Sequence, residues 1–222
     1  MNSALGYGFN VLAFVVGACV YFAEARRRRM HLPRMTEVAL FGAVLGVVAA
    51  AFGQWIYNSL SSHALDASGG RTIVGGVLGG WLGVEIAKRR IGIREATGPL
   101  WALALPAGES VGRLGCWFHG CCYGRVCTLP WAVEQHGAMR HPTQFYLSLA
   151  AFASLGILWW LKDRVDVFAL SLLLWSLSRI VIEPLRESSV QTPWVVLSIC
   201  FLVAVYAIVR LVRSCRTQLS PL

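Results

Sequence analysis

The chain has 222 residues, of which 56% are hydrophobic and 14% are charged, and its mean hydropathy is +0.59. Soluble domains carry about 25% charged residues, so the composition excludes an ordinary soluble protein. The apolar stretches are continuous rather than alternating, which indicates membrane helices and not a β-barrel. The net charge of +9 does not indicate a nucleic-acid partner, because the basic residues cluster at the ends of apolar stretches.

Seven stretches are apolar and close to the ~20 residues that a helix needs to cross a bilayer. We therefore predict an all-α integral membrane protein with about seven transmembrane helices, forming a single polytopic domain over residues 1–222. In chain order the predicted spans are 4–23, 37–57, 72–87, 98–114, 144–161, 165–182 and 192–212. The run GGVLGG (75–80) in the third span is interpreted as a helix-packing face, the usual use of glycine in membrane helices.

Basic residues cluster in alternate connections, at 26–34, 88–94, 162–164 and 210–216. The positive-inside rule places these connections in the cytoplasm, with the N-terminus outside and the C-terminus cytoplasmic. No basic residue precedes the first span, so we do not expect a cleaved secretory signal. The longest outer connection, at about 115–143, carries most of the unusual residues of the chain.

Six basic residues fall on the outer side, where the same rule disfavours them: Arg71, Arg113, Arg125, Arg140, Arg179 and Arg186. Snorkelling to headgroups or a simple ion pair is an alternative for any one of them. In SRIVIEPLR (178–186), however, the i, i+4 and i+7 spacing puts Arg179, Glu183 and Arg186 on one helix face. The planar donors of arginine match phosphate oxygens two at a time, which predicts a site for an anionic phospholipid headgroup.

Four motifs then occur in one order: GRLGCWFHGCCYGR (112–125), LPWAV (129–133), RHPTQFY (140–146) and SRIVIEPLR (178–186). In content, order and spacing they resemble the prolipoprotein diacylglyceryl transferase family, over about residues 68–187. The resemblance implies a seven-helix enzyme of the bacterial plasma membrane that moves a diacylglyceryl group from phosphatidylglycerol to a cysteine thiol, with glycerol phosphate leaving. The implied partners are phosphatidylglycerol, membrane lipid and a lipobox-type protein substrate, and no cofactor or metal is implied.

The resemblance also assigns residues. Arg113 and Gly115 match the family's G-R-x-G, and Arg113 and Arg179 are expected to stabilise the departing phosphate. The residues expected to bind substrate are Arg71, Gly115, Gly124, Arg125, Gln144, Tyr146, Glu183 and Arg186.

The chain departs from the family pattern at several positions. Cys116, His119 and Cys121 stand where the pattern has two asparagines and a glutamate, and Val74 replaces a histidine that is assigned as a base. His119 and His141 are then the candidates for taking the proton of the acceptor thiol, because histidine titrates near neutral pH. For His119 a purely hydrogen-bonded role in the loop is the alternative.

Four of the seven cysteines lie close together in the outer connection, at Cys116, Cys121, Cys122 and Cys127. Three interpretations stay open: a disulfide such as Cys122 with Cys127, a zinc site that includes His119, or a reactive thiol activated by Arg113 or Arg125. An alternative function follows from them, namely a non-catalytic, thiol-redox or metal-binding membrane protein that keeps the lipid pocket.

Overall fold

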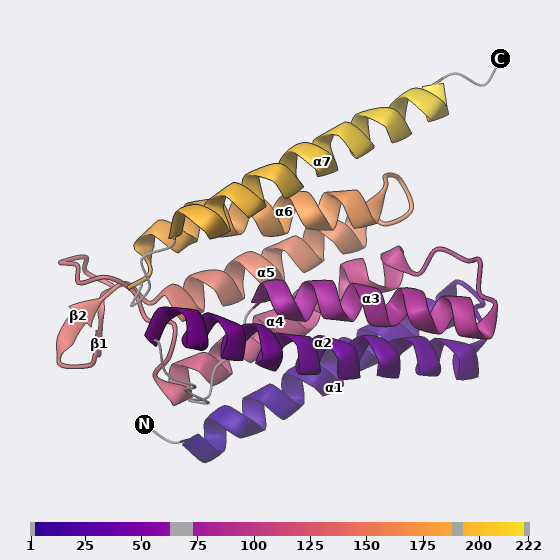
Figure 1. Cartoon of the computed structure of the whole chain (residues 1–222). Helices are drawn as coiled ribbons and strands as arrows, with labels where there is room; N and C mark the ends of the chain where they lie inside the picture. Colours follow the sequence, from indigo (N-terminus) through magenta and orange to yellow (C-terminus); the bar gives the residue numbers. More distant parts are fainter. Residues whose placement is uncertain (1–2, 63–72, 188–192, 220–222) are drawn as a thin grey trace. The chain divides into compact units, whose positions relative to one another are not determined.

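The computed structural model describes residues 3–62, 73–187 and 193–219, and this part of the chain is helical apart from one short hairpin (Figure 1). The helices are α1 (Ser3–Arg27), α2 (Leu32–Ser62), α3 (Ile73–Ile91), α4 (Gly98–His119), α5 (Thr143–Leu161), α6 (Val167–Ile182) and α7 (Pro193–Leu219). A short 3-10 turn, Glu183–Leu185, extends α6. The all-helical class is confirmed, and each helix covers most or all of one predicted span.

Five stretches within these helices are long and apolar enough to cross a membrane: Ser3–Arg27, Leu32–Gly53, Thr143–Leu161, Val167–Leu185 and Val196–Arg216. Among the described residues, α3 and α4 do not meet the same criteria. Their predicted spans are shorter, and α4 contains Pro106, Glu109 and Arg113. The chain is therefore a multi-pass membrane protein in which two helices are distinctly less apolar than the others.

The described chain divides into two compact units, of which residues 24–96 form one. Within it α2 and α3 pack closely through small residues. A Cβ atom added at Gly46 would lie 3.2 Å from the Gly76 carbonyl oxygen, and one added at Gly79 or Gly83 would collide with the backbone of α2. The interpretation of GGVLGG as a packing face is confirmed.

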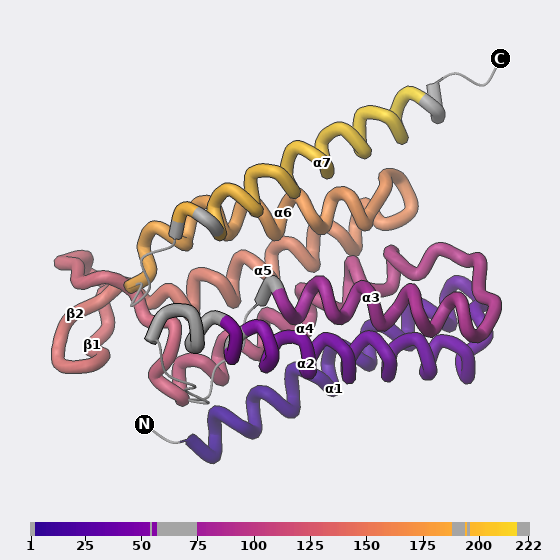
Figure 2. The backbone as a smooth tube through the Cα atoms, in the orientation of Figure 1, coloured from indigo at the N-terminus to yellow at the C-terminus, as the bar shows by residue number. Residues whose placement is uncertain are grey.

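The other unit comprises residues 1–23 and 97–222 and contains the motif-bearing segments. The first part of α1 lies against α4 through small residues, because a Cβ at Gly108 would stand 3.0 Å from the Ala13 carbonyl oxygen. Helix α4 contacts α5 and α6, and α6 contacts α7, whose course beside α6 is clear in Figure 2. The buried core between α4, α5 and α6 is formed by Ala102, Leu103, Leu158 and Val167.

The connection from α4 to α5 holds the hairpin. Helix α4 ends at Gly120, which adopts the left-handed conformation (φ 65°) that glycine tolerates best. Strands β1 (Val133–Gln135) and β2 (Ala138–Arg140) pair antiparallel around His136 and Gly137, which both have positive φ. Figure 1 shows the hairpin beyond the start of α5 and the end of α6. The sequence prediction of a plain outer loop at 115–143 missed these strands.

Candidate active site

An ion network joins α4 to α6 inside the motif-bearing unit. Glu109 lies one helical turn before Arg113, and its Oε1 accepts hydrogen bonds from Arg113 Nε at 3.1 Å and Nη2 at 2.7 Å. The same oxygen accepts from Arg179 Nη2 of α6 at 2.9 Å. One carboxylate thus holds together the two arginines that were expected to act in catalysis.

The network continues along α6 and its 3-10 extension. Glu183 Oε2 lies 3.7 Å from Arg179 Nη1, and Glu183 Oε1 accepts from Arg186 Nη1 at 2.6 Å. Arg179, Glu183 and Arg186 therefore converge as predicted, but not on one α-helical face, because α6 ends at Ile182, Glu183 starts the 3-10 turn and Arg186 follows it in extended conformation. Arg179 is only 3% exposed, so its charge is held away from bulk water.

The network has one positive charge in excess, since three guanidinium groups face two carboxylates. Its donors are also incompletely used. The buried Nε atoms of Arg179 and Arg186 donate to no acceptor among the described residues. Buried donors without partners are costly, so a positively charged pocket of this kind is suited to a monoanionic ligand with several acceptor oxygens.

The segment after the cysteines is fixed to the end of α6. Gly124 forms an isolated bridge with Arg186, and the Arg125 amide donates to the Leu185 carbonyl oxygen at 2.8 Å. The Arg125 carbonyl oxygen in turn accepts from the His141 amide at 3.0 Å. A Cβ at Gly124 would collide with the backbone of His141, which is the physical reason for glycine there. The Arg125 side chain is exposed.

The first turn of α5 supports the loop from the other side. Thr143 Oγ1 donates to the Cys122 carbonyl oxygen at 2.7 Å, and Gln144 Nε2 donates to the Cys121 carbonyl oxygen at 2.9 Å. Both side chains are fully buried. Tyr146 lies further along, where its hydroxyl accepts from Trp131 Nε1 at 2.7 Å. Gln144 and Tyr146, which were expected to bind substrate, therefore hold the loop 121–131 in place.

The two candidate histidines lie in different surroundings. His119 packs against α1, with Nε2 3.2 Å from Asn10 Nδ2 and its ring 4.9 Å from the ring of Tyr7. Gly115 also faces α1, because a Cβ there would stand 2.8 Å from Asn10 Oδ1. His141 instead follows the hairpin, and its buried Nδ1 has no hydrogen-bond partner among the described residues. The structure thus does not bring His119 and His141 to a common position.

Three of the four clustered cysteines converge. The Sγ atoms of Cys116, Cys121 and Cys122 all lie within 4.8 Å of one another, whereas Cys127 is not part of this group. All seven cysteines lie in the described part of the chain and are free thiols, so the Cys122–Cys127 disulfide is absent. Hydrogen bonds from the neighbouring thiols Cys116 and Cys121 lower the pKa of Cys122, and the charges of Arg186 and Arg113 act in the same direction.

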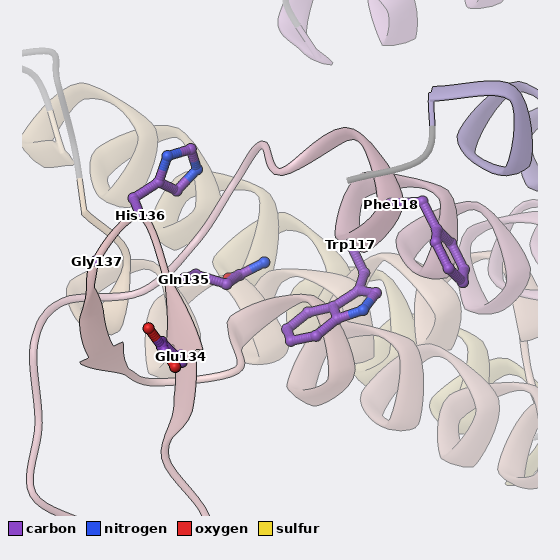
Figure 3. Close-up of a pocket in the computed structure, with 6 residues that line it drawn as sticks. All are labelled: Trp117, Phe118, Glu134, Gln135, His136 and Gly137. Atoms are coloured by element: carbon purple, nitrogen blue, oxygen red, sulfur yellow. The ribbon is translucent and has the colours of Figure 1, made fainter.

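Two cavities lie in the motif-bearing unit. One, of about 290 Å³, lies between the end of α4 and the hairpin, and Figure 3 shows the side chain of Gln135 pointing from β1 towards Trp117. The other, of about 540 Å³, is apolar and lies between α6 and α7. It is lined by Ile180, Trp194, Leu197, Ser198, Phe201 and Leu202.

Some site residues that the sequence predicted lie outside the described part of the chain, and two residues that contact the site were not predicted. Arg71 and the side chain of Val74 lie outside the described residues. Glu109 was not predicted, although its i, i+4 spacing to Arg113 was a readable signal. Thr143 was also missed, and no signal in the sequence distinguishes it from an ordinary helix-start threonine.

Comparison with known proteins identifies a family and similar proteins. The family model described as prolipoprotein diacylglyceryl transferase matches residues 5–212. Three proteins named phosphatidylglycerol–prolipoprotein diacylglyceryl transferase are among the similar ones. The protein from Thermotoga maritima is 29% identical over 82% of this chain and 70% of its own length. The proteins from Clostridium tetani and Coxiella burnetii are 26% and 27% identical over 82% of this chain, and over 80% and 76% of their own lengths.

The match runs through α1 and α7 and so extends well beyond the four motifs that first indicated a relationship. The matched range covers α4, α6 and the segment between them. The chain belongs to the prolipoprotein diacylglyceryl transferase family.

Proposed function

We propose that this protein transfers the diacylglyceryl group of phosphatidylglycerol to a cysteine thiol of a prolipoprotein, forming a thioether and releasing glycerol phosphate. Family membership over residues 5–212 and the names of the relatives support the activity and both substrate classes. The observation that carries the proposal in this chain is the Arg113–Glu109–Arg179 arrangement, with Arg186 at its outer end.

The ion network fits the donor lipid in charge. Its single excess positive charge is matched by the single negative charge of a phosphodiester, so the occupied site would be neutral. The Nε atoms of Arg179 and Arg186 would donate to phosphate oxygens, and the two glutamates would keep the guanidinium groups in place. The apolar cavity between α6 and α7 would accept part of an acyl chain.

The chemistry requires charge stabilisation where the carbon–oxygen bond breaks. The acceptor sulfur attacks the glycerol carbon that bears the phosphate ester, and the electron pair of the broken bond moves to the phosphate oxygen of the leaving group. That group gains a second negative charge, which the partly buried Arg113 and the buried Arg179 would stabilise from positions that are fixed before the reaction begins. The catalytic role of these two arginines is part of the proposal.

The proposed topology has seven transmembrane helices in a bacterial plasma membrane, with the N-terminus outside and the C-terminus cytoplasmic. The basic clusters in alternate connections support this orientation. Five of the seven spans have the required length and hydropathy. Helix α4 carries Glu109 and Arg113 because it would line the lipid site, where ionisable residues face protein or water rather than lipid tails.

The test is transfer itself, with purified protein in detergent, phosphatidylglycerol and a peptide that contains a lipobox cysteine. Mass spectrometry should show a diacylglyceryl adduct on the peptide, and Arg113→Ala should lower kcat by roughly 100- to 1,000-fold, the usual cost of removing one charge-stabilising donor. Arg164→Ala removes an exposed arginine between α5 and α6 and should keep full activity. A wild-type protein that binds the lipid but forms no adduct would contradict the proposal.

A further inference from the structure

The three converging thiols are the chemical feature that the proposed function does not use. Cys116 stands in the last turn of α4, and Cys121 and Cys122 follow its left-handed cap. Their Sγ atoms lie within 4.8 Å of one another. In a tetrahedral zinc site, with Zn–S bonds of about 2.3 Å, neighbouring sulfurs are about 3.8 Å apart, so the free thiols are already close to ligand spacing.

The backbone around these cysteines is fixed from several sides. The Cys121 amide donates to the Cys116 carbonyl oxygen at 3.1 Å, which closes the last turn of α4. Thr143 and Gln144, both fully buried in α5, hold the carbonyl groups of Cys122 and Cys121. Cys122 itself has a φ of 59°, a conformation that non-glycine residues rarely adopt. The packing thus holds the three sulfurs on one side of the loop.

The three cysteines lie close in the chain and in the fold to two arginines of the ion network. Cys116 lies one turn after Arg113 on α4, and the residues after Cys122 are bridged to Arg186. Three thiolates and a divalent cation carry one net negative charge, opposite in sign to the guanidinium groups of Arg113 and Arg186. Cys121 is exposed, so one side of the cluster stays open to a further ligand. Three protein ligands with an open fourth position are the pattern of catalytic rather than structural zinc sites.

We propose that Cys116, Cys121 and Cys122 bind one Zn²⁺ ion and that the fourth ligand is the thiolate of the acceptor cysteine. This inference rests on the proposed transferase function and names the group that prepares its nucleophile. His119 is not a ligand, because its ring packs against α1 with Asn10 and Tyr7.

The acceptor thiol binds Zn²⁺ through sulfur and loses its proton to water. Its sulfur then forms a bond to the glycerol carbon of the lipid, and the carbon–oxygen bond to phosphate breaks with its electron pair on the leaving oxygen. The neutral thioether is a weaker ligand than a thiolate and leaves the metal. A metal-bound thiol is deprotonated outright, whereas a free thiol with a pKa of about 8.5 is only about 3% thiolate at pH 7.

Metal binding is tested first, on the full-length protein in detergent. Elemental analysis after zinc addition and gel filtration should give one zinc per chain. Cys116→Ser and Cys122→Ser should lose the metal, while Cys127→Ser, in the same loop but outside the cluster, should keep it. Zinc binding that is absent, or unchanged in the first two variants, would overturn the proposal, as would a native disulfide among the three cysteines.

Acceptor binding is tested without turnover. Co²⁺ in place of Zn²⁺ should give thiolate-to-metal charge-transfer absorption and the visible bands of a tetrahedral site. With no lipid present, a lipobox peptide should shift these bands, and the same peptide with serine for cysteine should not. If the cysteine peptide does not shift the absorption bands, the acceptor thiolate is not the fourth ligand, even if the metal is bound.

Activity then separates the two proposals. Removing the metal with a chelator should lower transfer at pH 7 about thirty-fold, the factor by which full deprotonation raises the thiolate fraction, and zinc should restore it. Metal-free protein with full activity would leave the transferase standing and remove the zinc site. The opposite outcome is a zinc-loaded protein that forms no adduct although its cobalt form responds to the peptide. That outcome would keep the zinc site and contradict the transferase function.

Discussion

Glu109 and Arg179 are 70 residues apart in the chain, yet Glu109 Oε1 lies 2.9 Å from Arg179 Nη2 across the α4–α6 contact. The same oxygen binds Arg113, so a single carboxylate holds two guanidinium groups close together although their charges repel each other. This carboxylate sets the separation of the two charges that would hold the lipid phosphate.

Replacing Glu109 by glutamine should therefore separate these charges. Glu109→Gln keeps the shape but removes the negative charge between the partly buried Arg113 and the buried Arg179. Removing one partner of a fully buried ion pair costs about 3–5 kcal/mol, and we expect a smaller loss here because Glu109 and Arg113 are partly exposed. We expect transfer activity to fall by at least the order of 100-fold and the thermal midpoint in detergent to drop. Glu109→Asp keeps the charge and should recover part of the activity. Wild-type kinetics in Glu109→Gln would contradict the positioning role.

Arg179 offers a test of geometry against charge. Arg179→Lys keeps the positive charge but removes the planar donors, including the Nε that has no partner in the described part of the chain. We expect kcat to fall on the order of 100-fold in Arg179→Lys and further in Arg179→Ala, with membrane insertion intact in both. Steady-state kinetics with phosphatidylglycerol would measure this. Equal activity of the lysine variant and the wild type would show that charge alone is sufficient.

Gly124 should be intolerant of even one methyl group. A Cβ there would collide with the His141 backbone, so Gly124→Ala must displace either the hairpin end or the bridge to Arg186. We expect a loss of about 1–3 kcal/mol in stability, the usual range for overpacking. Gly156→Ala in α5, where a Cβ meets no atom within 4 Å, is the matched control and should be neutral or slightly stabilising. Thermal unfolding of both purified variants measures the difference in stability, and equal midpoints would contradict the prediction.

Topology can be checked with two single-cysteine variants. Helices α5 and α6 and nearly all of α7 separate Cys127 from Cys215, which stands near the end of α7, so the two thiols should lie towards opposite sides of the membrane. A membrane-impermeant maleimide added to intact cells should label the variant that retains Cys127 and not the one that retains Cys215. Detergent permeabilisation controls for access. Labelling of Cys215 in intact cells would reverse the orientation.

The sequence predicted the class of fold and part of the site for identifiable physical reasons. Hydrophobic length predicted the helices, and helical spacing predicted the shared face of Arg179 and Glu183. The sequence could not reveal the role of Glu109, because its second partner, Arg179, is known only once α4 is seen to pack against α6. The cysteine spacing also left the pairing open, since the positive φ at Gly120 and Cys122 decides which thiols converge.

The segment after Cys122 has a further consequence for how two substrates would share the site. One edge of it is hydrogen-bonded to Leu185 and bridged to Arg186, and the other edge is bonded to His141 beside the hairpin. Any shift that an acceptor peptide imposes at the hairpin would therefore reach Arg186, to which the proposed function assigns the lipid phosphate, through two backbone contacts. By thermodynamic reciprocity, lipid bound at Arg186 would change the affinity for the peptide by the same factor, so the two substrates would bind cooperatively rather than independently.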